Sequence, residues 1–242
     1  MGQHVHVAVP GPGAAVRALD GLRADLPVLL ALSANSPYWG GLESGFASIR
    51  TPLFSMFPRV GVPRHFGSYP AYVGTVAPML RSGAIADPGC LWWDARLRPE
   101  LGTVEVRIMD AQTRLRDAAA LAAVIQCLVR RHAMAPPERI RAPELLDENR
   151  FLAARDGMRA RLIDDRSHRA VPVLGALEEL LNRCEPFADG LDCTTELAAA
   201  AILADDPGDT RQRRFAARHG IAALPERLAG QFAGPAYKTL AA

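Results

Sequence analysis

Lysine is almost absent from this 242-residue chain: Lys238 is the only lysine among 28 basic residues, and arginine supplies the others. A P-loop lysine, a Schiff-base lysine and a lysine that holds nucleotide phosphates are therefore excluded, unless Lys238 serves from near the C-terminal end. Any phosphate that this protein binds must consequently be held by arginine, by backbone groups or by a metal ion.

The chain also lacks a hydrophobic run approaching the roughly 18 residues of a membrane span, and its start resembles no signal peptide. Hydrophobic residues make up 49% and charged residues 22%, which is ordinary for a soluble globular protein. We therefore expect a cytoplasmic protein without a membrane partner. A formal net charge of +2 is too even a balance to indicate nucleic-acid binding.

Cysteine is scarce and widely spaced. Cys90, Cys127, Cys184 and Cys193 fit neither a zinc ribbon nor a small disulfide framework. We expect four reduced thiols, with Cys127 in the core because it lies in an apolar helical stretch.

Local patterns predict a mixed first half and a nearly all-helical second half. The predicted strands cover residues 3–9, 91–96 and 103–110, the last two as an antiparallel pair. A helical pattern spans 14–34 with a second start at Pro27, and a long Gly-, Pro- and aromatic-rich loop follows to about residue 83. Later helices are predicted at 118–132 (with Asp117 as N-cap), 143–158, 174–184, 195–203 and 210–219. One domain is the default at this length.

Pairs of polar residues recur at a spacing of two in the predicted strands. His4 with His6, and Glu105 with Arg107, would each share one face of a sheet, which is how a metal and anion site is built. The same pairs could form a solvated lattice of ion pairs, and Asp94 with Arg96 raises the same question. Arg50, taken without context, is more often a surface arginine than a carboxylate clamp.

Several motifs resemble one family when they are taken in order. They are Gly2-x-His4-Val5-His6-Val7, the run 26–41 around Ser33-Ala34-Asn35-Ser36-Pro37, Ser44-Gly45-Phe46-Ala47-Ser48-Ile49-Arg50, Trp93-Asp94-x-Arg96, Thr103-Val104-Glu105-Val106-Arg107-x-x-Asp110, Glu148-Asn149-Arg150 and Arg211-Gln212-Arg213. In this order and spacing the chain resembles the carboxylate–amine ligases of the glutamate–cysteine ligase 2 type over nearly its whole length.

The resemblance implies an α+β, glutamine-synthetase-like fold, in which an antiparallel sheet with flanking helices curves around an active-site funnel. It implies ATP-dependent joining of the γ-carboxylate of glutamate to the amino group of cysteine, or of another amine, through an acyl phosphate. The implied cofactors are ATP and Mg2+, with Mn2+ possible. Residues 1–116 would form the sheet and substrate loop, and 117–242 the mainly helical part, of a single ligase catalytic domain.

The resemblance also assigns roles to residues. Arg107 matches an arginine placed for the transferring phosphoryl group and is the predicted catalytic residue. Glu105, His4 and His6 match positions around metal. The predicted substrate-binding residues are Arg50, Asn35, Asp94 and Arg96.

The chain departs from the family pattern at its start, because members carry a long preceding segment with a Gly-x-Glu-x-Glu strand. We therefore expect an N-terminally truncated, C-terminal part of the ligase that is inactive alone and prone to aggregate or to form a homo-oligomer. One alternative is a non-catalytic scaffold or subunit derived from the ligase. Another is a His-x-His metal-dependent hydrolase, although its further ligands are not obvious among the remaining histidines.

Overall fold

The computed structural model describes residues 2–137 and 139–240, and its mixture of helices and antiparallel strands is α+β, as predicted. The strands are β1 (Val5–Ala8), β2 (Tyr38–Trp39), β3 (Leu42–Glu43), β4 (Val60–Gly61), β5 (Trp92–Trp93), β6 (Ala95–Arg98), β7 (Thr103–Val106), β8 (Arg161–Asp164) and β9 (Arg169–Pro172). The helices are α1 (Pro12–Leu22), α2 (Leu26–Ser33), α3 (Arg50–Phe54), α4 (Tyr69–Arg81), α5 (Leu115–Met134), α6 (Pro143–Asp156), α7 (Val173–Ala188), α8 (Thr194–Asp205), α9 (Gly208–His219) and α10 (Leu224–Leu240).

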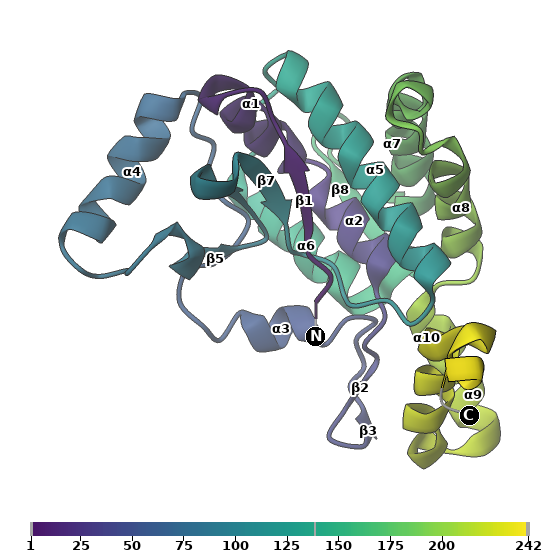
Figure 1. Ribbon diagram of the computed structural model, residues 1–242. Helices are drawn as coiled ribbons and strands as arrows, with labels where there is room; N and C mark the ends of the chain where they lie inside the picture. Colours follow the sequence, from purple (N-terminus) through teal and green to yellow (C-terminus); the bar gives the residue numbers. More distant parts are fainter. Residues whose placement is uncertain (1, 138, 241–242) are drawn as a thin grey trace.

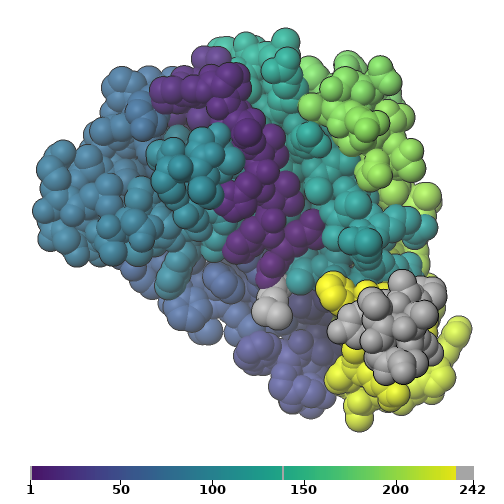
Figure 2. All heavy atoms as spheres, in the orientation of Figure 1, coloured from purple at the N-terminus to yellow at the C-terminus, as the bar shows by residue number. Residues whose placement is uncertain are grey.

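A three-stranded antiparallel sheet in the order β1-β7-β6 organises the first half. The predicted antiparallel pairing of the second and third strand runs is confirmed, and the N-terminal run joins the same sheet. Side chains alternate along the central strand, so Val104 and Val106 enter the core while Glu105 points to the opposite face. Figure 2 shows β1, in purple, lying across the visible surface of the molecule.

The strands are shorter than the sequence predicted. The run 91–96 is interrupted at Asp94, whose N–H donates to Gly61 O (2.8 Å), while its own carbonyl accepts from Arg107 N (2.7 Å). The chain therefore changes partner there: β5 pairs in parallel with β4, and only β6 continues along β7. The strand β7 likewise ends at Val106 instead of 110, although an isolated antiparallel bridge still pairs Asp110 with Gly2.

Helices α1 and α5 cover the apolar side of the sheet, and α7 and α8 pack against α5 (Figure 1). All eight residues of α2 are buried, because this helix is enclosed by α6, α7 and α8 and is apolar around its whole circumference. The four cysteines are free thiols, and Cys127 is buried in this core as predicted.

The long loop predicted up to residue 83 is corrected by the structure, since it contains α3, α4 and three short strands. Helix α4 begins after Ser68, whose hydroxyl accepts from Ala71 N (3.3 Å), and Pro70 fits its first turn. Gly74 and Pro78 inside α4 made this segment look non-helical. Tertiary contact with α1 supports it despite those residues.

Two features of the second half also differ from the prediction. The hairpin β8–β9 was missed, and it closes where Asp164 accepts from Ser167 N (3.0 Å). Asp117 is not the N-cap of α5, because this helix begins at Leu115 after Arg114. Asp117 lies in the first turn and accepts from Arg211 Nη2 (2.6 Å).

None of the helices in the described part of the chain combines the length and hydropathy needed to cross a bilayer. The side chain of Lys238, the only lysine, lies outside the described part of the structure.

Candidate active site

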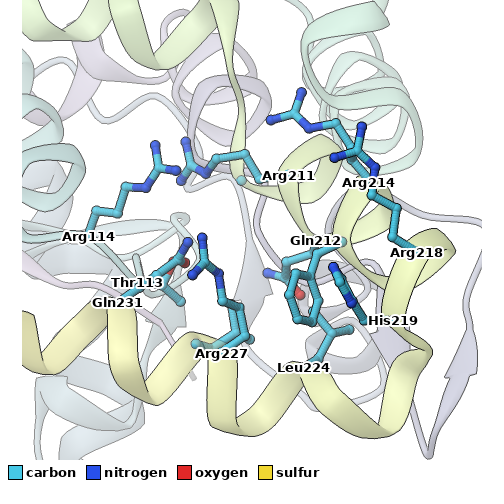
Figure 3. A pocket seen from close by; sticks show the side chains of 13 residues that line it. Thr113, Arg114, Arg211, Gln212, Arg214, Arg218, His219, Leu224, Arg227 and Gln231 are labelled. Carbon is cyan, nitrogen blue, oxygen red and sulfur yellow. The ribbon is translucent and has the colours of Figure 1, made fainter.

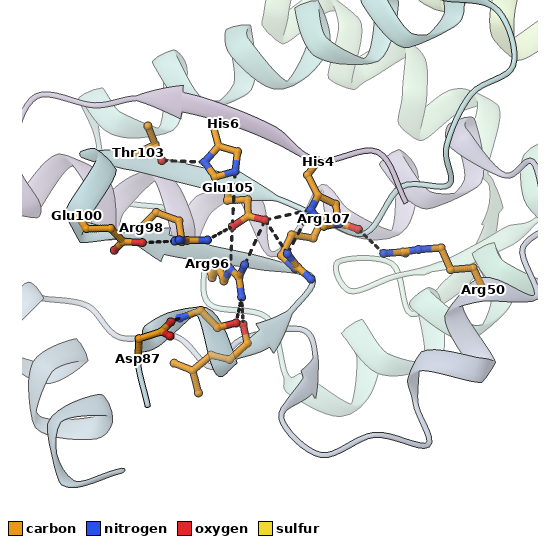
Figure 4. Close-up of polar contacts among 12 residues, drawn as sticks. His4, His6, Arg50, Asp87, Arg96, Arg98, Glu100, Thr103, Glu105 and Arg107 are labelled. Atoms are coloured by element: carbon orange, nitrogen blue, oxygen red, sulfur yellow. Dashed lines mark hydrogen bonds and ion pairs between the residues drawn. The ribbon is translucent and has the colours of Figure 1, made fainter. Parts of the chain in front are cut away.

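Three side chains meet in register on the polar face of the sheet. On β7, Glu105 lies directly opposite His6 of β1 on one side and Arg96 of β6 on the other. His4 lies two residues before His6, and Arg107 two residues after Glu105, so the period of the strand brings both to the same face. Figure 4 shows these side chains converging on the Glu105 carboxylate. That His4, His6, Glu105 and Arg107 share one face is as predicted.

Glu105 is the centre of this cluster. Its side chain is 1% exposed, and its Oε1 accepts from Arg107 Nη1 at 2.6 Å while its Oε2 accepts from Arg96 Nε at 2.8 Å. Arg98 Nη1 approaches Oε2 at 3.5 Å. The two imidazoles lie on the outer side, with His4 Nδ1 3.3 Å from Oε1 and His6 Nε2 3.7 Å from Oε2.

These neighbours keep Glu105 ionised. Burial by itself would raise its pKa, but hydrogen bonds from His4, Arg96 and Arg107 outweigh burial and hold the pKa well below its usual range. A buried carboxylate with several charge-assisted donors is a rigid anchor, because releasing one donor would leave charge unpaired in the interior. Glu105 therefore fixes the position of the arginines around it.

Arg96 is committed to structure as well as to Glu105. Its side chain is 6% exposed, and its Nη1 donates to the carbonyl oxygens of Gly89 and of Leu91 (2.9 Å for the latter). These bonds tie β6 to the turn that precedes β5. Its predicted substrate-binding role stays a prediction.

A small hollow beside the cluster gathers two other predicted residues, Arg50 and Asp94, with Arg107 of the cluster. It has room for about one water molecule (about 10 Å³), and Arg50, Asp94, Arg107 and Arg150 line it together with apolar side chains from α3, β4 and β5. Arg150 donates from Nε to Asp94 Oδ2 at 2.6 Å. Three guanidinium groups and one carboxylate thus surround this hollow.

Several donors in the hollow lack partners. The Nε atoms of Arg50 and Arg107 and the hydroxyl of Thr51 are buried and have no hydrogen-bond partner among the described residues. Burial also lowers the pKa of both arginines, because it removes water from their charged groups. Such a set of desolvated cations and free donors attracts an anion, and the hollow has room for one of its oxygen atoms.

Arg50 reaches the hollow from the start of α3. Its Nη1 and Nη2 donate to the carbonyl oxygens of Ile108 (3.1 Å) and Arg107 (2.9 Å), so its guanidinium spans the backbone that follows β7. The Phe54 ring lies 4.7 Å beneath it. A side chain on Gly2 would collide with this guanidinium, with a Cβ only 2.6 Å from Nη2, so glycine is needed there.

Asn35 lies in neither the cluster nor the hollow. Its backbone N–H donates to Asp110 Oδ2 (2.8 Å), and its side chain joins Ala111 O to Gln212 Nε2 (both 2.8 Å). Asp110 also accepts from the hydroxyls of Ser36 and Ser48 (2.7 and 2.9 Å). This buried network holds the loop that carries Arg50 against the end of β7. The substrate-binding role of Asn35 stays a prediction.

The sequence left Arg150 and Thr51 out of the site. Arg150 stands in the motif Glu148-Asn149-Arg150, which supports the family resemblance but does not indicate that Asp94 is its partner. No sequence pattern marks Thr51 as a site residue, since a single threonine after an arginine is common in proteins. Only the approach of α3 and α6 to the end of β5 shows that both belong to the hollow.

The predicted metal site consists of Glu105, His4 and His6. No group of three His, Cys, Asp or Glu side chains in the described ranges could hold a metal ion. Within the part of the chain that the structure describes, Glu105 is the one carboxylate that contacts His4 and His6, and arginines already occupy both of its oxygens. Mg2+ prefers several oxygen ligands, so the described residues in this arrangement do not fit such an ion.

Comparison with known proteins identifies the family. The model of glutamate–cysteine ligase family 2 matches residues 1–234. The chain belongs to this family. Two proteins of Rubrobacter xylanophilus that carry inferred glutamate–cysteine ligase 2 names are 41% and 44% identical to it, over 90% of this chain and 59% and 60% of their own lengths. A similarly named protein of Gloeobacter violaceus is 36% identical over 88% of this chain and 59% of its own length.

The glutamate–cysteine ligase 2 relatives are longer than this chain, which spans about 60% of their length. The match nevertheless includes the strands of the Glu105 cluster, the α3 segment and Arg150. These parts of the candidate site therefore lie inside the family region.

Proposed function

We propose that this chain is the part of an ATP-dependent carboxylate–amine ligase that binds the reacting anions. The reaction joins the γ-carboxylate of glutamate to the amino group of cysteine, or of another amine, through an acyl phosphate. The observation that carries the proposal is the hollow in which Arg50, Arg107 and Arg150 converge with unpartnered donors. Family membership supports the ligase class.

Ligases of this kind bring two negatively charged groups together, a carboxylate and a transferring phosphoryl group. Their repulsion must be offset before the bond can form, and preorganised cations in a water-poor site do this most effectively. Glu105 accepts a hydrogen bond from one side of the Arg107 guanidinium. The other side is therefore already oriented before an anion binds. Arg50 and Arg150 are held in the same way, by backbone carbonyls and by Asp94.

ATP with Mg2+, or with Mn2+, remains part of the proposal through family membership. When bound, the metal ion supplies charge neutralisation on phosphate oxygens. Within the described residues, however, a metal ion at Glu105 would have to displace arginine donors from the carboxylate. We therefore assign charge compensation on this face to the arginines, and the metal roles of His4, His6 and Glu105 remain untested predictions.

The test measures phosphate release in the presence of ATP, glutamate and cysteine. It uses the chain alone and a fusion protein. The fusion adds to this chain the part of one Rubrobacter xylanophilus relative that does not align with it. We expect the chain alone to be inactive and the fusion to release phosphate only when all three substrates are present. A folded fusion that shows no such dependence would contradict the proposal, and omission of each substrate in turn is the control.

The two alternative functions have weaker support. A His-x-His hydrolase needs further metal ligands, and none group with His4 and His6 in the described residues. A non-catalytic scaffold would not need desolvated arginines with free donors. Cytoplasmic location and the division into 1–116 and 117–242 also remain predictions.

A further inference from the structure

A second and larger cavity lies between α9, α10 and the residues that precede α5 (Figure 3). Its volume is about 320 Å³, which is within the range of small-molecule sites. No residue lines both this cavity and the hollow beside Glu105. Its apolar floor comes from Phe215, Leu224 and Leu228.

Positive charge dominates this cavity, which we call the α9–α10 cavity. Its lining includes five arginines, Arg114, Arg211, Arg214, Arg218 and Arg227, together with His219. No acidic side chain is present among the described residues that line it. A concave surface lined by one sign of charge concentrates ions of the opposite sign.

Neighbouring carboxylates offset only part of this charge. Asp117 accepts from Arg211 (2.6 Å). Asp206 pairs with Arg214 at 2.7 Å and with Arg114 at 3.5 Å. Two carboxylates therefore serve three of the arginines, and the other two remain.

Arg218 and Arg227 are those two arginines. Arg218 makes no hydrogen bond or ion pair with any residue that the structure describes. Arg227 lies 5.7 Å from the centre of the Phe215 ring. Among the described residues, this cation–π contact is the one polar or charged interaction that Arg227 makes. Their donors are free to bind an oxyanion that enters between α9 and α10.

The α9 wall of the cavity is held in place by contacts on two sides. On α9, Arg211 is 8% exposed and is fixed by Asp117, while Gln212 is 7% exposed and donates to Asn35 O (2.6 Å). Arg213, on the outer side of α9, donates to Glu43 (2.7 Å) and to Phe46 O (2.8 Å). Because α9 is held on two sides, its backbone needs little rearrangement when a ligand arrives.

We propose that the α9–α10 cavity binds a small multivalent oxyanion, one that carries phosphate groups or several carboxylates. Arg218 and Arg227 supply the free donors, and Arg211 and Arg114 add positive charge to the cavity wall. The apolar floor can pack against a short carbon skeleton. This site is separate from the proposed ligase site and does not depend on it.

The test follows the His219 ring by NMR, because this imidazole lies in the cavity and reports binding locally. The chain is titrated with inorganic pyrophosphate, with citrate and with acetate. The variants are Arg218→Ala combined with Arg227→Ala, and Arg130→Ala as a control that removes one exposed arginine from α5 instead. The substituted arginines are exposed, so folding should be retained.

We expect a saturable shift of the His219 signal with pyrophosphate or citrate. Tighter binding of pyrophosphate identifies the phosphate class, and tighter binding of citrate identifies polycarboxylates. The double variant should weaken this binding by about tenfold or more, since each charged hydrogen bond is worth roughly that factor, and the control should leave it unchanged. The proposal is overturned if neither anion shifts the signal, if acetate binds equally well, or if the double variant and the control behave alike.

Discussion

At the scale of single residues, Glu105 decides how the candidate site is held together. It is the common partner of Arg96 on β6, of Arg107 directly after β7, and of two histidines on and directly before β1. A single carboxylate that compensates several guanidinium groups makes each of those contacts depend on its negative charge. Loss of that charge therefore affects stability as well as chemistry.

We predict that Glu105→Gln destabilises the fold by about 3 to 5 kcal/mol, because the change leaves Arg96 and Arg107 buried without a carboxylate. Urea unfolding at neutral pH measures the loss. The control is Glu100→Gln, since Glu100 is 47% exposed and its pairing with Arg98 should be worth less than about 1 kcal/mol. Equal effects of the two substitutions would show that the cluster is not an anchor.

The same residue predicts a dependence on pH. The pKa of Glu105 is lower in the folded state than its ordinary value of 4.5, so the folded state holds fewer protons than the unfolded state in that range. Its stabilisation is fully present above pH 4.5 and is lost as pH falls below it. Between about pH 7 and about pH 3, the free energy of unfolding should therefore fall less for Glu105→Gln than for the wild type, which unfolding curves at each pH measure.

Arg107 carries the prediction for catalysis. In the active fusion, Arg107→Lys should lower turnover by about 10²- to 10³-fold, or about 3 to 4 kcal/mol, and should change ATP affinity much less. One ammonium cannot both hold Glu105 and present a planar pair of donors. Steady-state phosphate release gives both parameters, and Arg81→Lys on the exposed end of α4 is the matched control. A near-normal rate would remove Arg107 from the chemistry.

At the scale of elements, close helix packing depends on a glycine that the sequence does not mark. A Cβ on Gly21 of α1 would lie 2.3 Å from Nδ1 of His132 on α5. That imidazole also contacts Asp25 at 2.7 Å, and Arg183 of α7 donates to the same carboxylate at 2.8 Å. Three helices therefore meet at one buried polar group.

We predict that Gly21→Ala destabilises the fold by about 1 to 3 kcal/mol, because it pushes His132 away from Asp25. Gly175→Ala in α7 is the control, since open space surrounds its position and alanine favours the helix by about 0.4 to 1 kcal/mol. Thermal unfolding of both variants should shift in opposite directions. A stabilised Gly21→Ala would show that α1 and α5 can separate without cost.

At the scale of the whole molecule, the sheet has an open edge along β1. Val9 donates to Gly102 O, so the N–H groups of alternate residues of β1 point to β7 and those between them point away. No described strand pairs with that outer side. An exposed edge of this kind invites pairing with another chain.

We predict that the chain self-associates through this edge. Ala8 is exposed on β1, and Ala8→Lys should lower the association constant because a charged edge resists strand pairing. Sedimentation at several concentrations measures the effect, and Ala217→Lys on the exposed face of α9 is the control. A wild-type chain that stays monomeric throughout would contradict the prediction.

The sequence by itself determined the antiparallel strands, most of the helices after residue 115, and the meeting of His4, His6, Glu105 and Arg107 on one face. The elements and the shared side within each pair follow from local periodicity, since a spacing of two in a strand leaves little choice of side. That the two pairs lie on neighbouring strands followed from the resemblance to the family. Only the tertiary structure decided that arginines saturate Glu105, that Arg150 and Thr51 join the hollow, and that α9 and α10 enclose a basic cavity. Those contacts join segments far apart in the chain, and local patterns carry no information about which distant partner a buried charge will find.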